Sequence, residues 1–281
     1  MKKVILPTDF SDNAFNAITY AVKLYEKVPT TFYLLNTYTP VVYQPEYLMD
    51  SPGAIGMGDF YQEHSLSQLA SLKTKLEHLF PNAHHQFVPH SAFNILVVEI
   101  HSMVQNHGAD LVVMGTQGAT GAKEVLLGSH TVQAIKKAQC PILAIPAGFE
   151  YEVPKEIMFP TDYELDYRET QLKELLDIAR NHISSVEVLH AGTGRPLTDQ
   201  QLQHKEKLST LLQGIAHLHH LLPNQNVIAA INSFQQKKRM NLLAMVQNKH
   251  TFFERLFLEP VIQKLGFRAT IPFLVLPHLA P

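Results

Sequence analysis

The sequence predicts a doubly wound, Rossmann-like α/β fold that is built twice along the chain. Short apolar runs alternate with segments whose apolar residues recur at helical spacing, and strands separated by helices pair in parallel. The chain also repeats itself. Lys3–Phe10 (KVILPTDF) returns as Glu156–Tyr163 (EIMFPTDY), and Cys140–Pro146 returns as Ile271–Pro277. Two copies of one domain are therefore expected.

The boundary between the copies is expected in a short linker. Residues 147–154 (AGFEYEVP) contain the glycine and proline typical of such a segment. We predict a first domain over residues 1–147 and a second over residues 154–281. The length of 281 residues suits two domains of ordinary size.

The elements of the first half follow from local patterns. The apolar run Val4–Leu6 predicts the first strand, and Ser11 can cap the helix after it. The elements expected next are a strand over Phe32–Leu35, a loop over about 39–58, a helix over Leu66–Phe80, a weak strand over Gln86–Val88, a helix over Ile95–Gln105, a strand over Asp110–Met114, a helix after Ser129 and a strand over Ile142–Ile145.

The second half follows the same plan with one expected loss. Its third strand is expected to end before Ile231, and its fourth is predicted over Asn241–Met245. The residues between them, Ile231–Met240, barely allow a crossover helix, so we expect a short or broken one.

The composition excludes several classes of protein. Hydrophobic residues make up 46% of the chain, charged residues 17%, and the net charge is -2. No basic face for a nucleic acid is indicated, and no apolar run approaches the length of a membrane span. The N-terminus lacks a signal-peptide pattern, and the single cysteine, Cys140, allows no disulfide framework. We expect a cytoplasmic protein, without nucleic-acid or membrane partners, in which Cys140 is a buried small side chain.

Histidines are frequent, with 16 in the chain. They cluster at His217, His219 and His220, and again at His84, His85 and His90. Metal sites need ligands that converge, whereas the adjacent His219 and His220 would diverge on a helix. We therefore favour a solvated helix at His217–His220 and keep a structural metal site as the alternative.

A glycine-containing segment, Met114–Thr131, carries the main functional signal. Its spacing is Gly-x2-Gly-x9-Gly-Ser, starting at Gly115, and it lies between a predicted strand and a predicted helix. Glycines permit positive φ and a close approach of the backbone to a ligand, and a helix start binds anions. The hydroxyls of Ser129 and Thr131 can add donors. The alternative is that the glycines form a tight turn and that Asp9 caps the first helix.

This segment resembles the nucleotide loop of the universal stress protein family, and Leu6–Ser11 (LPTDFS) matches that family's first strand and turn. The resemblance covers nearly the whole chain. It implies a five-stranded parallel sheet in each half and ATP, with or without Mg²⁺, in the first half. The resemblance implies these contacts: Pro7, Thr8 and Asp9 beside adenosine, Thr37 against adenine, and Met114, Gly115, Gly118, Gly128, Ser129, His130 and Thr131 around ribose and phosphates.

A general rule of open α/β sheets leads to the same place. Ligands bind at the carboxyl ends of the strands, where the strand order reverses. Asp9 follows the first strand and Gly115 follows the fourth. With a strand order of the 2-1-3-4-5 type, we expect the two motifs to converge on one crevice.

The second half has lost the glycine segment. Aligning Met245 with Met114 without gaps replaces the site residues by bulky, acidic or imino ones. The replacements are Val246 for Gly115, Lys249 for Gly118, Glu259 for Gly128 and Pro260 for Ser129. Pro260 lacks an N–H donor and Glu259 repels an anion. We predict a degenerate domain without ATP, in which Asp162 is a turn residue or a helix cap.

The sequence thus predicts a nucleotide-binding regulatory module of the stress response, for which catalysis is not required. The alternatives are a slow ATPase or nucleotide transferase, and a scaffold protein with a vestigial pocket. The apolar final strands, Ile142–Ile145 and Phe273–Leu276, invite edge pairing. We expect them to join the halves as an intramolecular pseudo-dimer, and a homodimer of two chains is left open.

Overall fold

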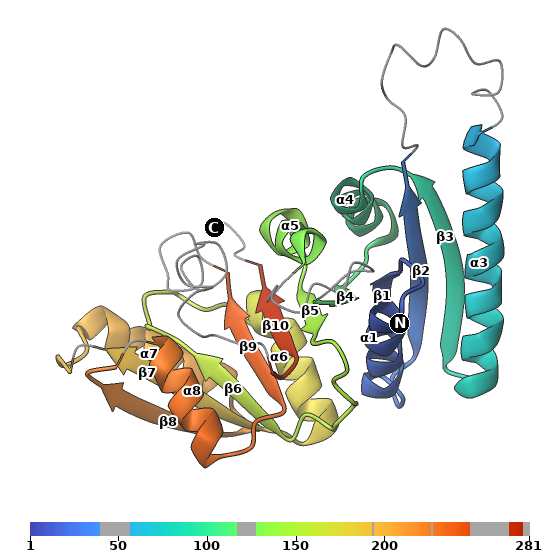
Figure 1. Cartoon of the computed structure of the whole chain (residues 1–281). Coiled ribbons are helices and arrows are strands. Elements are labelled where there is room, and N and C mark those ends of the chain that lie inside the picture. Colours follow the sequence, from blue (N-terminus) through green and yellow to red (C-terminus); the bar gives the residue numbers. More distant parts are fainter. Residues whose placement is uncertain (40–56, 117–127, 193, 226, 248–269, 278–281) are drawn as a thin grey trace, which may run out of the picture.

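The computed structural model contains one sheet of ten strands, in the order β3-β2-β1-β4-β5-β10-β9-β6-β7-β8 (Figure 1). It describes residues 1–39, 57–116, 128–192, 194–225, 227–247 and 270–277. The first half contains β1 (Lys2–Pro7), α1 (Asp12–Leu24), β2 (Thr30–Tyr38), α3 (Met57–Leu79), β3 (His85–Phe93), α4 (Leu96–His107), β4 (Leu111–Gly115), α5 (Ser129–Lys137) and β5 (Ile142–Ile145). The second half contains β6 (Glu156–Pro160), α6 (Glu169–His182), β7 (Ser185–Gly192), α7 (Asp199–Leu211), β8 (Ala216–Pro223), α8 (Val227–Lys237), β9 (Leu242–Val246) and β10 (Phe273–Leu276).

The two halves repeat one strand order. In the first half the order is β3-β2-β1-β4-β5, and in the second it is β8-β7-β6-β9-β10, with every pair inside a half parallel. The doubly wound fold class is therefore confirmed for both. The expected 2-1-3-4-5 order is wrong, because β1 lies between β2 and β4, as in the Rossmann order. The order reverses between β1 and β4.

The final strands of the halves join the two sheets. β5 and β10 pair antiparallel, and Leu143 lies opposite Leu274 at the centre of the pairing. The predicted contact between these two strands is thus present. Ten strands become one sheet because each half covers the apolar edge of the other.

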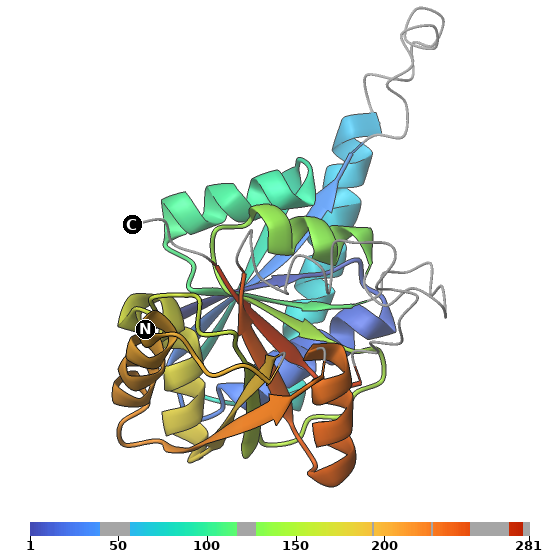
Figure 2. The same cartoon turned by 90° about the vertical axis from the view of Figure 1, so that its left-hand side faces the viewer.

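Helices cover both faces of this twisted sheet, whose strands fan out in Figure 2. Buried side chains of α1, α3, α6 and α7 pack into one core, on one face. Buried side chains of α4, α5 and α8 pack into a second core, on the other face. Both cores contain residues of both halves, so the halves share their hydrophobic interior.

Two expectations for the second half are wrong. The third strand is β8, which contains His217, His219 and His220, so these histidines do not lie on a solvated helix. The crossover helix α8 is neither short nor broken, since it has 11 residues. The apolar run that begins at Val227 starts this helix, and it buries Ile228 and Ile231 against the sheet. Its apolar residues suit a buried helix as well as a strand.

Within the described residues, none of the helices combines the length and hydrophobicity that a membrane crossing requires. Cys140 is buried, and burial raises the pKa of its thiol to about 12, so it is a packed side chain rather than a nucleophile.

Candidate functional site

A tight turn ends β1 and opens the candidate site. The backbone N–H of Thr8 donates to the carbonyl of Leu35 at 2.8 Å, which continues the pairing with β2. The hydroxyl oxygen of Thr8 accepts from the N–H of Phe10 at 2.9 Å, and Phe10 has a φ of 63°. The turn therefore directs the chain away from the sheet directly after Pro7.

Asp9 supports the start of α1 without capping it. Its Oδ1 accepts from the backbone N–H of Ser11 at 3.1 Å and from the Ser11 hydroxyl at 2.5 Å. Ser11 is the N-cap, as predicted, and its Oγ accepts from the N–H of Ala14 at 3.3 Å. The Asp9 carboxylate thus holds the side chain of Ser11 in its capping position. Asp9 also lines the cavity described below.

Across the site from this turn lie the end of β4 and the start of α5. Gly115 ends β4, and Gly128 is the N-cap of α5 with a φ of -58°. The buried Thr131 hydroxyl donates to the carbonyl of Gly115 at 2.9 Å. The Thr131 hydroxyl therefore joins α5 to β4, whereas the sequence predicts that it donates to a phosphate. Neither glycine uses the positive φ that glycine permits, because Gly128 has a negative φ and Gly115 lies in a strand.

The first turn of α5 keeps its capacity to bind an anion. Backbone N–H groups at the start of a helix have no carbonyl acceptor in the preceding turn, and the helix dipole favours negative charge there. Ser129 and His130 begin this helix, and both are exposed. They lie at the end of the helix where the sequence predicts phosphates.

The two motifs converge on one cavity of about 130 Å³. It lies at the reversal between β1 and β4, at the carboxyl ends of the strands. Six predicted residues line it: Pro7, Thr8, Asp9, Thr37, Met114 and His130. Gly115, Gly128, Ser129 and Thr131 adjoin it through β4 and α5 without lining it, and Gly118 lies outside the described residues.

Asn36 is the most informative residue that the sequence did not single out. Its amide donates to the carbonyl of Thr8 at 2.8 Å, and its Oδ1 accepts from the hydroxyl of Ser65 at 2.8 Å. Ser65 is buried on α3 and also bonds Ser91 of β3 at 2.8 Å. Asn36 therefore ties the turn at the cavity to α3 and β3. The only signal in the sequence is a polar residue just before Thr37. Ala14, Leu35 and Leu96 complete the lining.

The second half keeps the turn of the first. The N–H of Thr161 donates to the carbonyl of Leu189 at 2.8 Å, and the N–H of Tyr163 donates to the Thr161 hydroxyl at 2.9 Å. Asp162 accepts from the N–H of Glu164 at 3.0 Å. Asp162 is thus a turn residue. The alternative of a helix cap is wrong, because Arg168 occupies the N-cap of α6.

Aromatic side chains pack around this second turn. Tyr163 is buried, stacks on His190 with ring centroids 5.1 Å apart, and bonds His219 through its hydroxyl at 2.7 Å. Tyr167 bonds the Thr161 hydroxyl at 2.7 Å. Of the four replaced loop positions, Val246 ends β9, and Lys249, Glu259 and Pro260 lie outside the described residues.

The described residues around the cavity offer a metal ion few carboxylate ligands. Among the residues that the structure describes, no group of three or more His, Cys, Asp or Glu side chains converges as metal ligands do. Among the described residues that line the cavity, Asp9 is the one carboxylate, and Mg²⁺ prefers several oxygen ligands. A magnesium ion at this place would depend mainly on phosphate and water oxygens.

Comparisons with known proteins agree with this architecture. The model of the universal stress protein family matches residues 1–146. Universal stress protein MJ0531 of Methanocaldococcus jannaschii is 27% identical over 153 residues, which are 51% of this chain and 81% of that protein. The crystal structure of a universal stress protein from Archaeoglobus fulgidus aligns with a TM-score of 0.70 at 17% identity, over 98% of this chain and 96% of that chain. A functionally unknown protein from Pseudomonas aeruginosa, PA1789, aligns with a TM-score of 0.59 at 14% identity, over 99% and 92%. The two last likenesses extend the same fold over both halves.

Proposed function

Because this chain belongs to the universal stress protein family, we propose that its first half binds ATP and that the protein is a regulatory module of the stress response in the cytoplasm. The observation that carries the proposal is the convergence of two distant motifs on one cavity. Residues of the Pro-Thr-Asp turn line it together with Met114 and His130, which come from β4 and α5. Their meeting point is where open α/β sheets bind ligands.

The cavity residues suit the parts of a nucleotide. Leu35, Leu96 and Met114 offer apolar surface for a flat base, and Thr37 adds a hydroxyl beside it. His130 and the backbone of Ser129 belong to the first turn of α5, where negative charge is stabilised. When bound, ATP would supply a triphosphate for this end of the helix. The chain itself would orient the nucleotide between β1 and β4.

The cavity between the described residues is small. Its volume of about 130 Å³ is below the roughly 300–1,000 Å³ of common ligand pockets. We therefore assign the nucleoside end of ATP to the described walls. The phosphate end is assigned to the segment that follows Gly115, from its sequence pattern.

The second half is proposed to serve as a partner domain. It repeats the fold and the turn, whereas Tyr163, Tyr167 and His190 pack around that turn. Pairing of β5 with β10 joins the halves in the manner of two subunits, which supports an intramolecular pseudo-dimer. We propose one ATP site per chain, in the first half, because aromatic side chains pack around the turn of the second half.

The test uses the purified full chain. Denaturation should release an adenine nucleotide detectable by mass spectrometry, or titrated ATP should give a calorimetric binding signal. Thr37→Phe fills the cavity and should abolish binding. Ala191→Phe is the matched control, because Ala191 follows Leu189 as Thr37 follows Leu35 in the paired strands. ATP binding that is absent in the wild type, or equal in both variants, would refute the proposal.

A further inference from the structure

The two ends of the sheet differ in how they are covered. At one end, α3 packs along β3 (Figure 1), and Pro89 in the middle of β3 has no N–H to offer. At the other end lies β8, to whose outer edge no strand is paired within the described residues. Natural proteins usually protect such an edge with charged residues, a proline or a covering helix.

β8 carries none of the usual protection in its sequence. Its eight residues, AHLHHLLP, contain no Lys, Arg, Asp or Glu, and proline occurs only at the end. Each of the eight is exposed or half-buried, although half of them are Leu or Ala. Leu218 is 60% exposed and Leu221 is 63% exposed. An apolar edge strand that keeps exposed leucines is a site for association.

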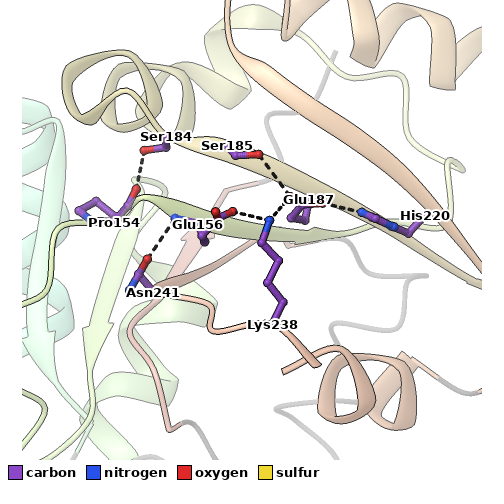
Figure 3. Close-up of polar contacts among 8 residues, drawn as sticks. All are labelled: Pro154, Glu156, Ser184, Ser185, Glu187, His220, Lys238 and Asn241. Carbon is purple, nitrogen blue, oxygen red and sulfur yellow. Dashed lines mark hydrogen bonds and ion pairs between the residues drawn. The ribbon is translucent and has the colours of Figure 1, made fainter. Parts of the chain in front are cut away.

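The inner side of β8 is firmly attached. His220 bonds the buried carboxylate of Glu187 on β7 at 2.5 Å, and Lys238 reaches the same carboxylate at 2.6 Å (Figure 3). His219 bonds Ser209 of α7 at 2.8 Å. These contacts fix the strand on the sheet, so its outer edge is preformed for pairing and needs no ordering on association.

We infer that β8 pairs antiparallel with β8 of a second copy of this chain and extends the sheet across a two-fold axis. An edge of unpaired N–H and C=O groups is complementary to itself, and a two-fold interface uses the same patch on both copies. Without charged side chains, β8 does not repel its own copy. The chain already joins its halves by antiparallel pairing of short apolar strands, β5 with β10.

The register follows from the leucines. Leu218, His220 and Leu222 alternate onto the face that α8 covers, where Leu222 packs on the core. If the two-fold axis passes through His220, Leu218 of each copy lies opposite Leu222 of the other copy. The exposed surface of Leu218 is then buried in the dimer.

Sedimentation velocity of the full chain tests the inference. We expect a species of twice 31.7 kDa. Leu218→Lys and Leu221→Glu should each weaken the dimer at least about tenfold, because they place charge at the edge. Leu202→Lys, at an exposed site on α7, is the matched control and should leave the dimer unchanged. Circular dichroism verifies that each variant folds. A monomer at about 100 µM, or a dimer that both edge variants leave intact, overturns the inference.

Cross-linking tests the register even if one edge variant folds poorly. Leu218→Cys combined with Leu222→Cys should give a covalent dimer on mild oxidation. The two positions lie about 13 Å apart along one strand, too far for a disulfide within the chain. Cys140 is buried and should not compete. A double-cysteine variant that stays monomeric under oxidation contradicts the register.

Discussion

Asn36 and His190 stand at the same position in the two halves, and each donates a hydrogen bond to the carbonyl oxygen of the threonine in a Pro-Thr-Asp turn. The distances are 2.8 Å from Asn36 to Thr8 and 3.0 Å from His190 to Thr161. The same turn is present beside the cavity in the first half and among packed aromatic residues in the second half. The Pro-Thr-Asp motif therefore has a structural role in both halves, whether or not a ligand binds beside it. Ligand binding depends on the side chains around it.

Asn36→Ala should destabilise the protein by about 1–2 kcal/mol, because it leaves the Thr8 carbonyl without its amide donor and Ser65 without one partner. Under the proposed function it should also weaken ATP binding, since Asn36 holds the turn that lines the cavity. Urea unfolding and calorimetry measure the two effects. Asn106→Ala, on the exposed surface of α4, is the control and should change stability by less than about 0.5 kcal/mol. Equal stability of both variants would show that the hydrogen bonds of Asn36 do not stabilise the turn.

Local patterns were sufficient for much of the fold. The strand at Val4–Leu6, the cap at Ser11 and the final strand Ile142–Ile145 depend on neighbours in the sequence, and the structure has all three. The internal repeat also indicated that two similar halves exist. Strand order could not be derived in this way. Alternation of strands and helices fits several parallel orders, and long-range packing selects among them.

The edge strand β8 and the candidate site contain features that local sequence patterns do not predict. β8 has no clean alternation, since His219 and His220 are neighbours and Leu221 and Leu222 follow; pairing with β7 makes it a strand. In the site, the local sequence pattern located β4 and α5 correctly. It could not reveal that Thr131 turns its hydroxyl to Gly115, or that Asn36 reaches Thr8, because both contacts join residues from different elements.

Glu174 should contribute strongly to the stability of the contact between the two halves. Its carboxylate lies on α6 and accepts from the hydroxyl of Tyr25 at 2.5 Å and from the ammonium of Lys2, both in the first half. The side chains of Lys2 and Glu174 are 8% and 3% exposed. Burial, together with the Glu174 carboxylate, raises the pKa of Tyr25, so the phenol remains a donor.

Glu174→Ala should therefore cost about 3–5 kcal/mol, because it leaves the Lys2 charge buried and unpaired. The double variant Lys2→Met with Glu174→Leu should recover part of this loss. On the same helix, Lys173→Ala breaks an exposed pair with Asp177 and should cost less than about 1 kcal/mol. Denaturant unfolding measures all three. A loss in Glu174→Ala no larger than that of Lys173→Ala would show that the buried pair does not hold the halves together.

His219 should make the second half sensitive to acid. Ser209 donates its hydroxyl proton to the carbonyl of Lys205, so it accepts from the Nε2–H of His219. The Nδ1 of His219 then accepts from the Tyr163 hydroxyl. Burial, with Lys205, His217 and His220 nearby, lowers the pKa of His219 from 6.5 to about 4. Burial thus keeps the ring neutral, and each of its two nitrogens has a hydroxyl partner.

The sign of the pH effect follows from this lowered pKa. As pH falls below 6.5, the unfolded state binds a proton at His219 that the folded state refuses until about pH 4, so the free energy of unfolding decreases across that window. Since the ring is half-exposed, solvent reduces the size of the loss. His219→Gln cannot titrate, and its urea midpoint should fall less than that of the wild type between pH 6.5 and pH 4. Above the window the two proteins should show the same pH dependence. Parallel declines within the window would mean that other groups cause the acid sensitivity.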